Sequence, residues 1–384
     1  MKSNLCRRRL LVRQAGMRLR RKKILLSGNE AIAQGAIDAG CRFYAGYPIT
    51  PQNELIGYMA KNMVSSGGVF IQSESELAAI NMVFGASASG VRAMTSSSSP
   101  GISLMQEGIS YLAGARLPAV IINIMRAGPG LGNIWPAQSD YFQATKSGGH
   151  GDYHCIVLAP SSVQDAYDLT FEAFVLADKY RIPVIILGDA ILGQMMEPLS
   201  VHSKKLRTRN YEPGTTKKWA ATGCKGRKPN VVKSFYLNLG ELEKFNLKLQ
   251  RKYNIIKQKE QRYEALNTTD ARVILVAYGT MARLAKQAMV SLREKGVRVG
   301  LIRPINLWPF PVDIFKRITN HACLPARQES RITFLVIEMS YGQMLEDVKL
   351  TVNGRARVEF LGRSGGGIPS EGQIIRKTVK LLNG

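Results

Sequence analysis

The chain has few cysteines, and none of them shows the spacing that holds a metal cluster. Its 384 residues contain five, which stand singly at Cys6, Cys41, Cys155, Cys224 and Cys323. No Cys-x-x-Cys occurs, so we expect no zinc, iron–sulfur or other metal site within this chain. Isolated cysteines also favour a reducing compartment, and we expect a cytoplasmic protein.

Long apolar runs are absent as well. No run reaches the roughly 18–20 residues that a membrane span requires, so we expect no transmembrane helix and no membrane partner. A hydrophobic content of 45% with 21% charged residues is typical of a globular protein. The length leaves room for two domains with full-sized cores.

Acidic residues are scarce in two segments, which explains a net charge of +25. Residues 1–23 contain ten Lys/Arg and no acid, and residues 203–262 contain seventeen Lys/Arg and four Glu. The remaining body of the chain is therefore close to neutral. A nucleic-acid-binding fold carries its basic stripe on a recognisable reading module, and none occurs here, so we expect no nucleic-acid partner.

Several phosphate and nucleophile motifs are also missing. The glycines of Gly128 to Gly132 are interrupted by Pro129 and lack a following helix, which excludes a Rossmann fingerprint. Gly188-Asp189 has no paired Asn downstream, so a metal–diphosphate motif is incomplete, and no Gly-x-Ser-x-Gly elbow occurs. The serine run Ser96 to Ser99 is suited to a phosphate or a pyrimidine, but no Walker lysine accompanies it.

What the chain does contain is an alternation of short apolar runs with helical stretches. This pattern predicts an α/β protein with parallel sheets covered by helices on both faces. We expect a basic N-terminal extension at 1–23, a first domain at 24–199, a basic inter-domain arm at 200–270 and a second α/β domain at 271–384. Strands of the first domain are predicted at Cys41–Tyr47, Val69–Gln72, Val91–Thr95, Ala119–Met125, Cys155–Leu158 and Val184–Leu187. In the arm, Glu241 to Glu264 has helical character.

A strand runs into a helix start in the segment Phe43-Tyr44-Ala45-Gly46-Tyr47-Pro48-Ile49-Thr50-Pro51-Gln52-Asn53-Glu54. We predict Thr50 as the N-cap, Pro51 as the first helical residue and Glu54 in the first turn. Unpaired N–H groups and a hydroxyl would then face the carboxyl edge of a parallel sheet, where α/β proteins bind small anions. The alternative is an ordinary capped strand–turn–helix.

Two further strand ends carry charged side chains. After Val69–Gln72, a capping box of Ser73 with Glu76 accounts for Glu76, whereas Glu74 either complements the helix dipole or has a functional role. After Ala119–Met125, Arg126 offers a planar cationic fork suited to a carboxylate, unless it is a surface Arg at a strand exit. The Gly- and Pro-rich stretch that follows, residues 127–153, reads as a functional loop or a lid.

Taken together, these motifs resemble the alpha subunit of the 2-oxoacid:ferredoxin oxidoreductases, which use thiamine diphosphate. The resemblance rests on Gly28-Asn29-Glu30-Ala31, Gly46-Tyr47-Pro48-Ile49-Thr50-Pro51, Gln72-Ser73-Glu74, Thr95 to Pro100, Asn123-Ile124-Met125-Arg126 and Ser161 to Ala166. In the second half, Ala277 to Thr280 and Arg303 to Pro311 resemble a transketolase C-terminal domain. The expected folds are a pyrimidine-binding domain at 24–199 and a transketolase C-terminal-like domain at 271–384.

The resemblance implies roles for individual residues. In that family the Glu that matches Glu74 bonds the aminopyrimidine ring and favours the tautomer that removes the C2 proton of the thiazolium. Glu74 is therefore the expected catalytic residue, and Pro48 and Ile49 join it in binding the cofactor. Thr50 and Arg126 match residues that hold the carboxylate of the substrate.

The resemblance also implies partners. The magnesium–diphosphate motif and the cluster cysteines lie on other subunits in this family, so we expect a beta subunit that holds the diphosphate, magnesium and an iron–sulfur cluster. Gamma and ferredoxin-like delta subunits are expected too. The reaction would be coenzyme-A-dependent oxidative decarboxylation of a 2-oxoacid, with ferredoxin as the electron acceptor.

The run from Gly128 to Lys146, together with Pro51-Gln52-Asn53-Glu54, looks closest to the branched-chain members, which act on 2-oxoisovalerate. The alternative substrate is 2-oxoglutarate, whose second carboxylate needs another cation near the site, and Lys146 is available for it. An alternative function, outside catalysis, is that of a scaffold subunit that kept the fold and lost turnover.

Overall fold

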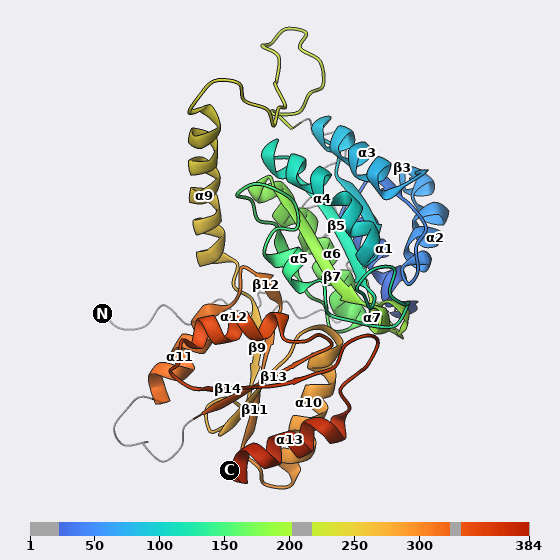
Figure 1. The fold of residues 1–384 in the computed structure, drawn as a ribbon. Coiled ribbons are helices and arrows are strands. Elements are labelled where there is room, and N and C mark those ends of the chain that lie inside the picture. The colour runs from blue at the N-terminus through green and yellow to red at the C-terminus, as the bar shows by residue number, and fades with distance from the viewer. Residues whose placement is uncertain (1–22, 202–216, 323–331, 384) are drawn as a thin grey trace, which may run out of the picture.

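The computed structural model describes residues 23–201, 217–322 and 332–383. The predicted extension at 1–23 therefore lies outside the described residues except for Lys23, as does part of the arm. Two lobes, each built on one sheet, stand one above the other in Figure 1. Helices flank the sheets, so the predicted α/β class with parallel sheets is confirmed.

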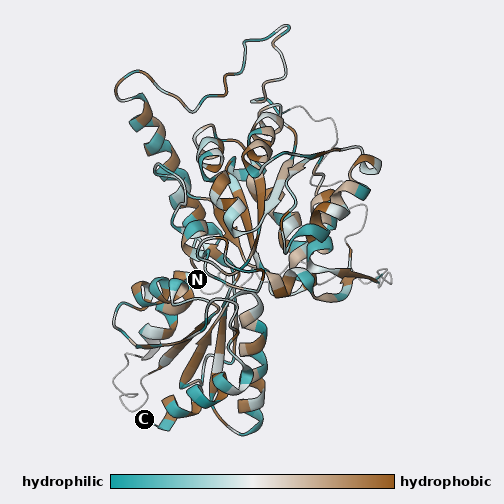
Figure 2. Ribbon diagram, turned by 45° about the vertical axis from the view of Figure 1, so that its right-hand side comes forward, coloured by the Kyte–Doolittle hydropathy of each residue, from teal (hydrophilic) through white to brown (hydrophobic). Residues whose placement is uncertain are grey.

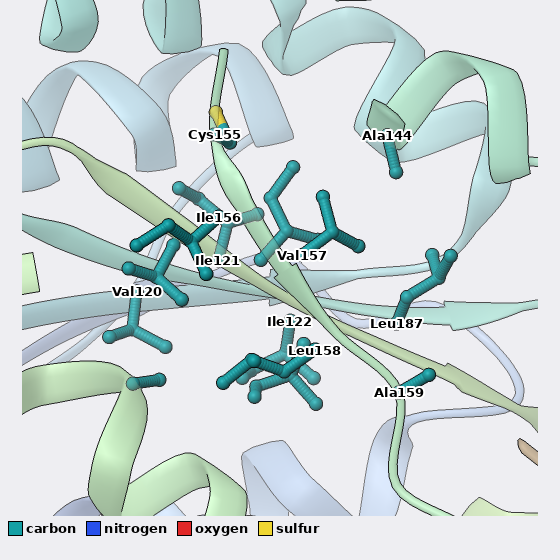
Figure 3. Close-up of a cluster of buried hydrophobic side chains, with 14 of the residues drawn as sticks. Val120, Ile121, Ile122, Ala144, Cys155, Ile156, Val157, Leu158, Ala159 and Leu187 are labelled. Atoms are coloured by element: carbon teal, nitrogen blue, oxygen red, sulfur yellow. The ribbon is translucent and has the colours of Figure 1, made fainter. Parts of the chain in front are cut away.

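The sheet of the first lobe has the strand order β12-β6-β7-β5-β4-β2-β3. Six of its strands, β2 to β7, pair in parallel with their neighbours. Helices connect each of them to the next along the chain. The bounds of these strands are Phe43–Gly46, Val69–Gln72, Ala93–Ser97, Ala119–Met125, Ile156–Leu158 and Pro183–Asp189. Every residue of β5 and β7 is buried, as expected for a parallel strand covered on both faces. Figure 3 shows side chains of β5 and β6 on both sides of the sheet.

Helices cover this sheet, and the first of them shows how local sequence defines an element. The Ser27 side chain accepts from the backbone N of Glu30 (3.2 Å), whose carboxylate accepts from the backbone N of Ser27 (2.8 Å). This capping box starts α1, and Gly40 follows its end with a φ of +81°. The helices of this lobe are α1 (Gly28–Asp38), α2 (Asn53–Asn62), α3 (Glu76–Ala88), α4 (Ser99–Gly114), α5 (Tyr141–Thr145), α6 (Val163–Tyr180) and α7 (Ala190–Gln194). A short 3₁₀ helix, Val64–Ser66, follows α2.

A small two-stranded sheet joins the two ends of the first lobe. Strand β1 (Lys23–Ser27) pairs antiparallel with β8 (Met196–Ser200). Neither strand was expected from the sequence, because only one residue of each is buried and neither forms the apolar run of a core strand.

The arm leaves the first lobe after β8. Its residues 217–240 form neither helix nor strand. Ala220 is buried and Ala221 N donates to Ala88 O at 2.9 Å, and beyond this contact the segment extends past the body of the molecule in Figures 1 and 2. Helix α9 (Glu241–Lys259) follows, with a single buried stripe at Leu249, Tyr253 and Ile256. The predicted helix to Glu264 is too long, because Tyr263–Leu266 instead forms strand β9, antiparallel to β11.

The second lobe is a five-stranded sheet with the order β14-β13-β10-β11-β9. Its remaining strands are β10 (Val273–Val276), β11 (Val299–Pro304), β13 (Thr333–Glu338) and β14 (Arg357–Gly362). The helices are α10 (Gly279–Glu294), α11 (Val312–Ala322), α12 (Gln343–Val352) and α13 (Glu371–Asn383). Figure 2 shows the apolar strands inside and the polar helix faces outside.

The two lobes interlock. Strand β12 (Asn306–Trp308) leaves the second lobe and pairs antiparallel with β6 of the first. The loop 127–153, expected to be functional or a lid, contains α5, and this helix packs on the second lobe. The hydroxyl of Tyr141 donates to Asp347 at 2.6 Å, and Phe142 N donates to the side chain of Gln343 at 2.8 Å. Among the described residues, no helix is long and apolar enough to span a bilayer.

Candidate active site

The turn after β2 is the first element of the site. It is closed by a hydrogen bond from Gln52 N to Ile49 O (3.1 Å), and α2 begins at Asn53 with Gln52 as its N-cap. The predicted N-cap at Thr50 and helix start at Pro51 are therefore wrong. The reason is that the carbonyl of Pro51 faces other partners, the side-chain amides of Asn29 (2.8 Å) and Gln194 (3.0 Å).

Buried side chains hold this turn against the sheet. Gln52 is fully buried, and its side-chain carbonyl accepts from the Ser96 hydroxyl at 2.7 Å. Ser96, at the end of β4, also shares a hydrogen bond of 2.6 Å with the Tyr44 hydroxyl of β2. Glu54 does lie in the first turn of α2, and its carboxylate accepts from Asn29 at 2.8 Å. The turn is thus a rigid part of the sheet edge.

Arg126 meets this turn from the end of β5. Its guanidinium donates through Nη1 to the carbonyl of Thr50 (3.0 Å) and through Nη2 to the carbonyl of Leu131 (3.2 Å). The side chain is buried, and its Nε has no partner among the described residues. The alternative of a surface Arg is therefore excluded, and Thr50 and Arg126 lie together as expected. Pro48 is exposed and Ile49 half-buried in the same turn.

A polar network fixes the backbone that carries Arg126. The Ser99 hydroxyl accepts from Arg126 N (3.0 Å), lies 3.1 Å from Arg126 O and donates to the carboxylate of Asp140 (2.6 Å). Asn123 donates to the same carboxylate oxygen at 2.9 Å and accepts from Ser99 N at 3.2 Å. Burial raises the pKa of Asp140, and the hydrogen bonds from Ser99 and Asn123 oppose that rise.

Two carboxylates at the start of α3, Glu74 and Glu76, have opposite environments. Helix α3 begins at Glu76 with Ser75 as its N-cap, which accepts from Ala78 N at 3.1 Å. The predicted capping box of Ser73 with Glu76 is wrong, because the Glu76 side chain faces inward and accepts from the Ser97 hydroxyl at 3.1 Å. Glu76 is 5% exposed, whereas Glu74 is exposed and has no side-chain hydrogen bond within the described part of the chain.

The serine run at the end of β4 therefore contacts three parts of the site. Ser96 holds the turn at Gln52, Ser97 contacts Glu76, and Ser99 holds Arg126. Between them, Ser98 Oγ is buried without a partner in the described ranges, at the N-terminus of the 16-residue helix α4. An unpaired buried hydroxyl, a buried carboxylate and a guanidinium with a free N–H are groups that a polar heterocycle or a carboxylate satisfies.

The geometry of α4 requires glycine beside the Glu76 carboxylate. A Cβ at Gly101 would lie 2.0 Å from Ser97 Oγ and 2.3 Å from Glu76 Oε1. Both distances are shorter than any side-chain contact allows. The Pro100-Gly101 sequence thus brings the helix start close to the carboxylate.

Two other charged groups considered from the sequence, Asp189 and Lys146, are paired with residues of the second lobe. Asp189 is buried and accepts from the Thr280 hydroxyl at 2.8 Å, so it joins the lobes rather than starting a metal motif. Lys146 forms an ion pair with Asp347 of α12. Within the described ranges, no group of three or more His, Cys, Asp or Glu could hold a metal ion.

Sequence reasoning missed Glu76 and Asp140 as members of this site, and it considered Ser97 and Ser99 only as part of a serine run suited to a phosphate or a pyrimidine. A signal for Glu76 was present, because Ser73 and Ser75 are both acceptable N-caps and the apolar helical pattern starts only at Leu77. If Ser75 is the cap, no capping role remains for Glu76. For Asp140, which follows a Gly- and Pro-rich loop, the sequence contains no comparable signal.

Residues 34–273 match the family described as pyruvate flavodoxin/ferredoxin oxidoreductase, thiamine diphosphate-binding. Residues 271–374 match core domain II of pyruvate:ferredoxin oxidoreductase. The chain is 50% identical to the ketoisovalerate oxidoreductase subunit VorB of Methanothermobacter marburgensis, over 92% of this chain and 96% of that protein. It is 41% identical to the 2-oxoglutarate synthase subunit KorA of Archaeoglobus fulgidus, over 85% of this chain and 90% of that protein.

A solved structure has the same fold. It is the 2-oxoglutarate:ferredoxin oxidoreductase from Magnetococcus marinus with 2-oxoglutarate, coenzyme A and succinyl-CoA bound, at a TM-score of 0.81 and 26% identity. The alignment covers 93% of this chain and 65% of that one. The resemblance drawn from the motifs is thereby confirmed. The chain belongs to the 2-oxoacid:ferredoxin oxidoreductases, a family of oxidoreductases that function with partner subunits, and it carries their thiamine-diphosphate-binding domain.

Proposed function

We propose that this chain is the alpha subunit of an enzyme that oxidatively decarboxylates a 2-oxoacid, transfers the acyl group to coenzyme A and reduces ferredoxin. The observation that carries the proposal is the buried Arg126 guanidinium, which is bound to the carbonyl of Thr50 and whose Nε has no partner in the described part of the chain. A buried cation with an unused donor suits the carboxylate that every 2-oxoacid presents. The N-terminus of α4 adds a favourable field for an anion at the same edge.

We further propose that Glu76 holds the aminopyrimidine of thiamine diphosphate. A carboxylate that stabilises one tautomer of a ring nitrogen works best away from water, and Glu76 is buried where Glu74 is exposed. Glu74, the residue matched by motif, is the competing assignment for this role. Thr50, Pro48 and Ile49 would contact the substrate or the cofactor from the turn after β2. When bound, thiamine diphosphate supplies a carbon nucleophile for the 2-oxo carbon and an electron sink for decarboxylation.

The protein's own residues have three tasks in this scheme. Arg126 and the Thr50 turn orient the carboxylate of the substrate, which places its 2-oxo carbon. Ser97 and the close approach at Gly101 hold the carboxylate of Glu76 in one position. Burial of these groups excludes water from the reacting carbon.

The proposed complex contains a beta subunit that binds the diphosphate, magnesium and an iron–sulfur cluster, with gamma and ferredoxin-like delta subunits. It is supported by the subunit names of the relatives and by the incomplete metal–diphosphate motif at Asp189, which the Thr280 contact occupies. The cytoplasm is the proposed location, because Cys41 and Cys155 are buried free thiols and Cys224 is an exposed one.

The proposed substrate is 2-oxoisovalerate. The 50% identity to a ketoisovalerate oxidoreductase subunit exceeds the 41% identity to a 2-oxoglutarate synthase subunit. In addition, Lys146, the cation considered for a second carboxylate, is paired with Asp347. The pairing of Lys146 weakens the case for a second carboxylate on the substrate and supports an apolar side chain instead.

The experiment is an anaerobic purification through a tag on this chain, followed by coenzyme-A-dependent viologen reduction. The substrates are 2-oxoisovalerate, 2-oxoglutarate and pyruvate. A preference for 2-oxoisovalerate supports the full proposal, and a preference for 2-oxoglutarate retains the chemistry but refutes the substrate. Absence of turnover with all three, despite co-purified subunits, would favour the scaffold alternative.

A further inference from the structure

The arm exposes apolar side chains that the described part of the molecule does not cover. Within residues 231–247, Val231 is 76% exposed, Phe235 72% and Leu237 84%. The other members of this set are Leu239, Leu242 and Leu247. We call these six side chains the arm surface. Six exposed large apolar side chains within one short projecting segment exceed the singly scattered ones that a monomer surface normally shows, which favours a protein contact.

Helix α9 carries more cations than the two carboxylates of its first turn, Glu241 and Glu243, can balance. Lys244, Lys248 and Arg251 lie on α9 and form no ion pair with any described residue. At the root of the arm, Lys252 Nζ donates to Arg181 O (3.4 Å), and Arg181 Nε donates to Arg116 O (3.2 Å). No carboxylate pairs with these three cations among the described residues. Burial, followed by the charges of Arg116 and Arg181, lowers the pKa of Lys252 to about 8.

A groove lies at the foot of the arm surface. Its volume is about 1180 Å³, and it is lined by α9 and by the loop that precedes β6. The lining includes Leu239, Leu242 and Leu247 from the arm surface, together with Asp152 and Gln250. The groove is wide enough for several side chains of another protein.

We propose that the arm surface, its groove and the adjacent cations dock a companion subunit of the same complex through an apolar ridge flanked by carboxylates. The identification of the occupant as a companion subunit rests on the proposed function. Charge complementarity favours a companion subunit over a second copy of this chain, because a second copy would bring the same positive charge to the contact. Nucleic acid would satisfy the cations but leave Val231, Leu237 and Leu239 unburied, since aliphatic side chains do not stack on bases.

The test measures assembly rather than turnover. The tagged chain is co-expressed with its companion subunits, and the dissociation constant of the purified complex is measured by light scattering over a dilution series at low and high salt. One variant carries Leu237→Asp with Leu239→Asp, and a second carries Lys244→Glu, Lys248→Glu and Arg251→Glu. Matched controls carry Val64→Asp with Leu350→Asp, and Lys295→Glu, Arg298→Glu and Lys380→Glu, at exposed sites away from the arm.

The apolar variant is expected to raise the dissociation constant at least tenfold. The charge variant should raise it at low salt and remove its dependence on salt, because rim charges act mainly through screened attraction. Circular dichroism checks that each variant is folded. Unchanged dissociation in both arm variants, or equal weakening in the controls, overturns the proposal.

Two other occupants of the arm surface, a second copy of this chain and a nucleic acid, would each give a distinct result. If the isolated tagged chain is a dimer that Leu237→Asp with Leu239→Asp dissociates, the occupant is a second copy and the proposal is wrong. If the purified protein absorbs at 260 nm as a nucleic-acid complex and nuclease removes the partner, it is wrong as well. Arm variants that assemble normally and reduce viologen refute this proposal alone. A wild-type complex that depends on the arm but acts on no 2-oxoacid refutes the proposed function alone.

Discussion

The carboxylate of Glu76 accepts a hydrogen bond from the hydroxyl of Ser97, which joins the start of α3 to the end of β4. The two side chains are both buried, and Gly101 of α4 approaches them so closely that no Cβ fits. The start of α3, the end of β4 and the start of α4 therefore all meet at one carboxylate oxygen of Glu76. Glu74, two residues earlier, is exposed and takes no part in this contact.

The first prediction compares these two carboxylates. Glu76→Gln should lower the viologen-reduction rate of the assembled complex by at least a hundredfold, because the amide does not stabilise the same tautomer of the cofactor. Glu74→Gln, the matched control, should retain near-normal turnover. Assembly of both variants is checked by size-exclusion chromatography. The opposite order of rates would restore Glu74 as the catalytic residue and remove Glu76 from the site.

The second prediction concerns Gly101. Gly101→Ala should displace the Ser97 hydroxyl and the Glu76 carboxylate, because its Cβ would lie within 2.3 Å of both. Turnover should fall at least tenfold, and the free energy of unfolding should fall by about 1–3 kcal/mol, as for other overpacked sites. Gly57→Ala, in α2 with open space around its Cβ, is the control and should raise stability by about 0.5–1 kcal/mol. Equal activity in the two variants would contradict the arrangement at Gly101.

The third prediction concerns the guanidinium of Arg126. Arg126→Lys keeps the charge but loses the fork that reaches both Thr50 O and Leu131 O. The variant should raise the KM for the 2-oxoacid at least tenfold, whereas the KM for coenzyme A should stay within twofold. Steady-state kinetics with each substrate varied in turn measures both values. An unchanged KM for the 2-oxoacid would show that its carboxylate binds elsewhere.

The fourth prediction concerns the support of Arg126. Ser99→Ala removes the hydroxyl that contacts Arg126 N and Asp140, and leaves the Asp140 carboxylate with one fewer donor. The free energy of unfolding should fall by about 1–2 kcal/mol. The KM for the 2-oxoacid should also rise, with less effect on kcat at saturation. A stability loss with no change in KM would limit Ser99 to a structural role.

Much of the fold could be predicted from local pattern, because buried parallel strands are continuous apolar runs. Strands β3 and β5 coincide with the predicted ranges Val69–Gln72 and Ala119–Met125. Strand β12 could not be found in this way. It is a three-residue strand between two prolines, Pro304 and Pro309, and its partner β6 is about 150 residues away in sequence.

The residues of the site likewise divide into those that local pattern could predict and those that it could not. Thr50 and Arg126 could be placed together, because the carboxyl ends of neighbouring parallel strands share one edge. Whether Glu74 or Glu76 faces the inside of the fold could not be predicted, because it depends on which serine caps α3. The burial of Glu76 against Ser97 is the observation on which the proposal for Glu76 rests.

The fifth prediction concerns acid stability at the junction of the lobes. His154 stacks on Trp308 of β12 with ring centroids 4.5 Å apart and meets Tyr253 of α9 edge-on at 5.4 Å. Burial, followed by the charges of Lys257 and Lys146, lowers the pKa of His154 to about 4. In the unfolded chain the imidazole has its ordinary pKa near 6.5.

The unfolded state therefore binds more protons than the folded state between about pH 6.5 and pH 4. The stability that this group contributes is present above pH 6.5 and is lost as the pH falls toward 4. The full difference would be about 3 kcal/mol, and solvent screening of the half-buried ring reduces it to about 1–2 kcal/mol. His154→Phe keeps a ring on Trp308 and removes the titration. Urea unfolding at pH 7 and pH 4.5 should show a smaller acid-dependent loss in His154→Phe than in the wild type. Equal losses in the two proteins would mean that protonation of His154 does not oppose the packing of β12 on the first lobe.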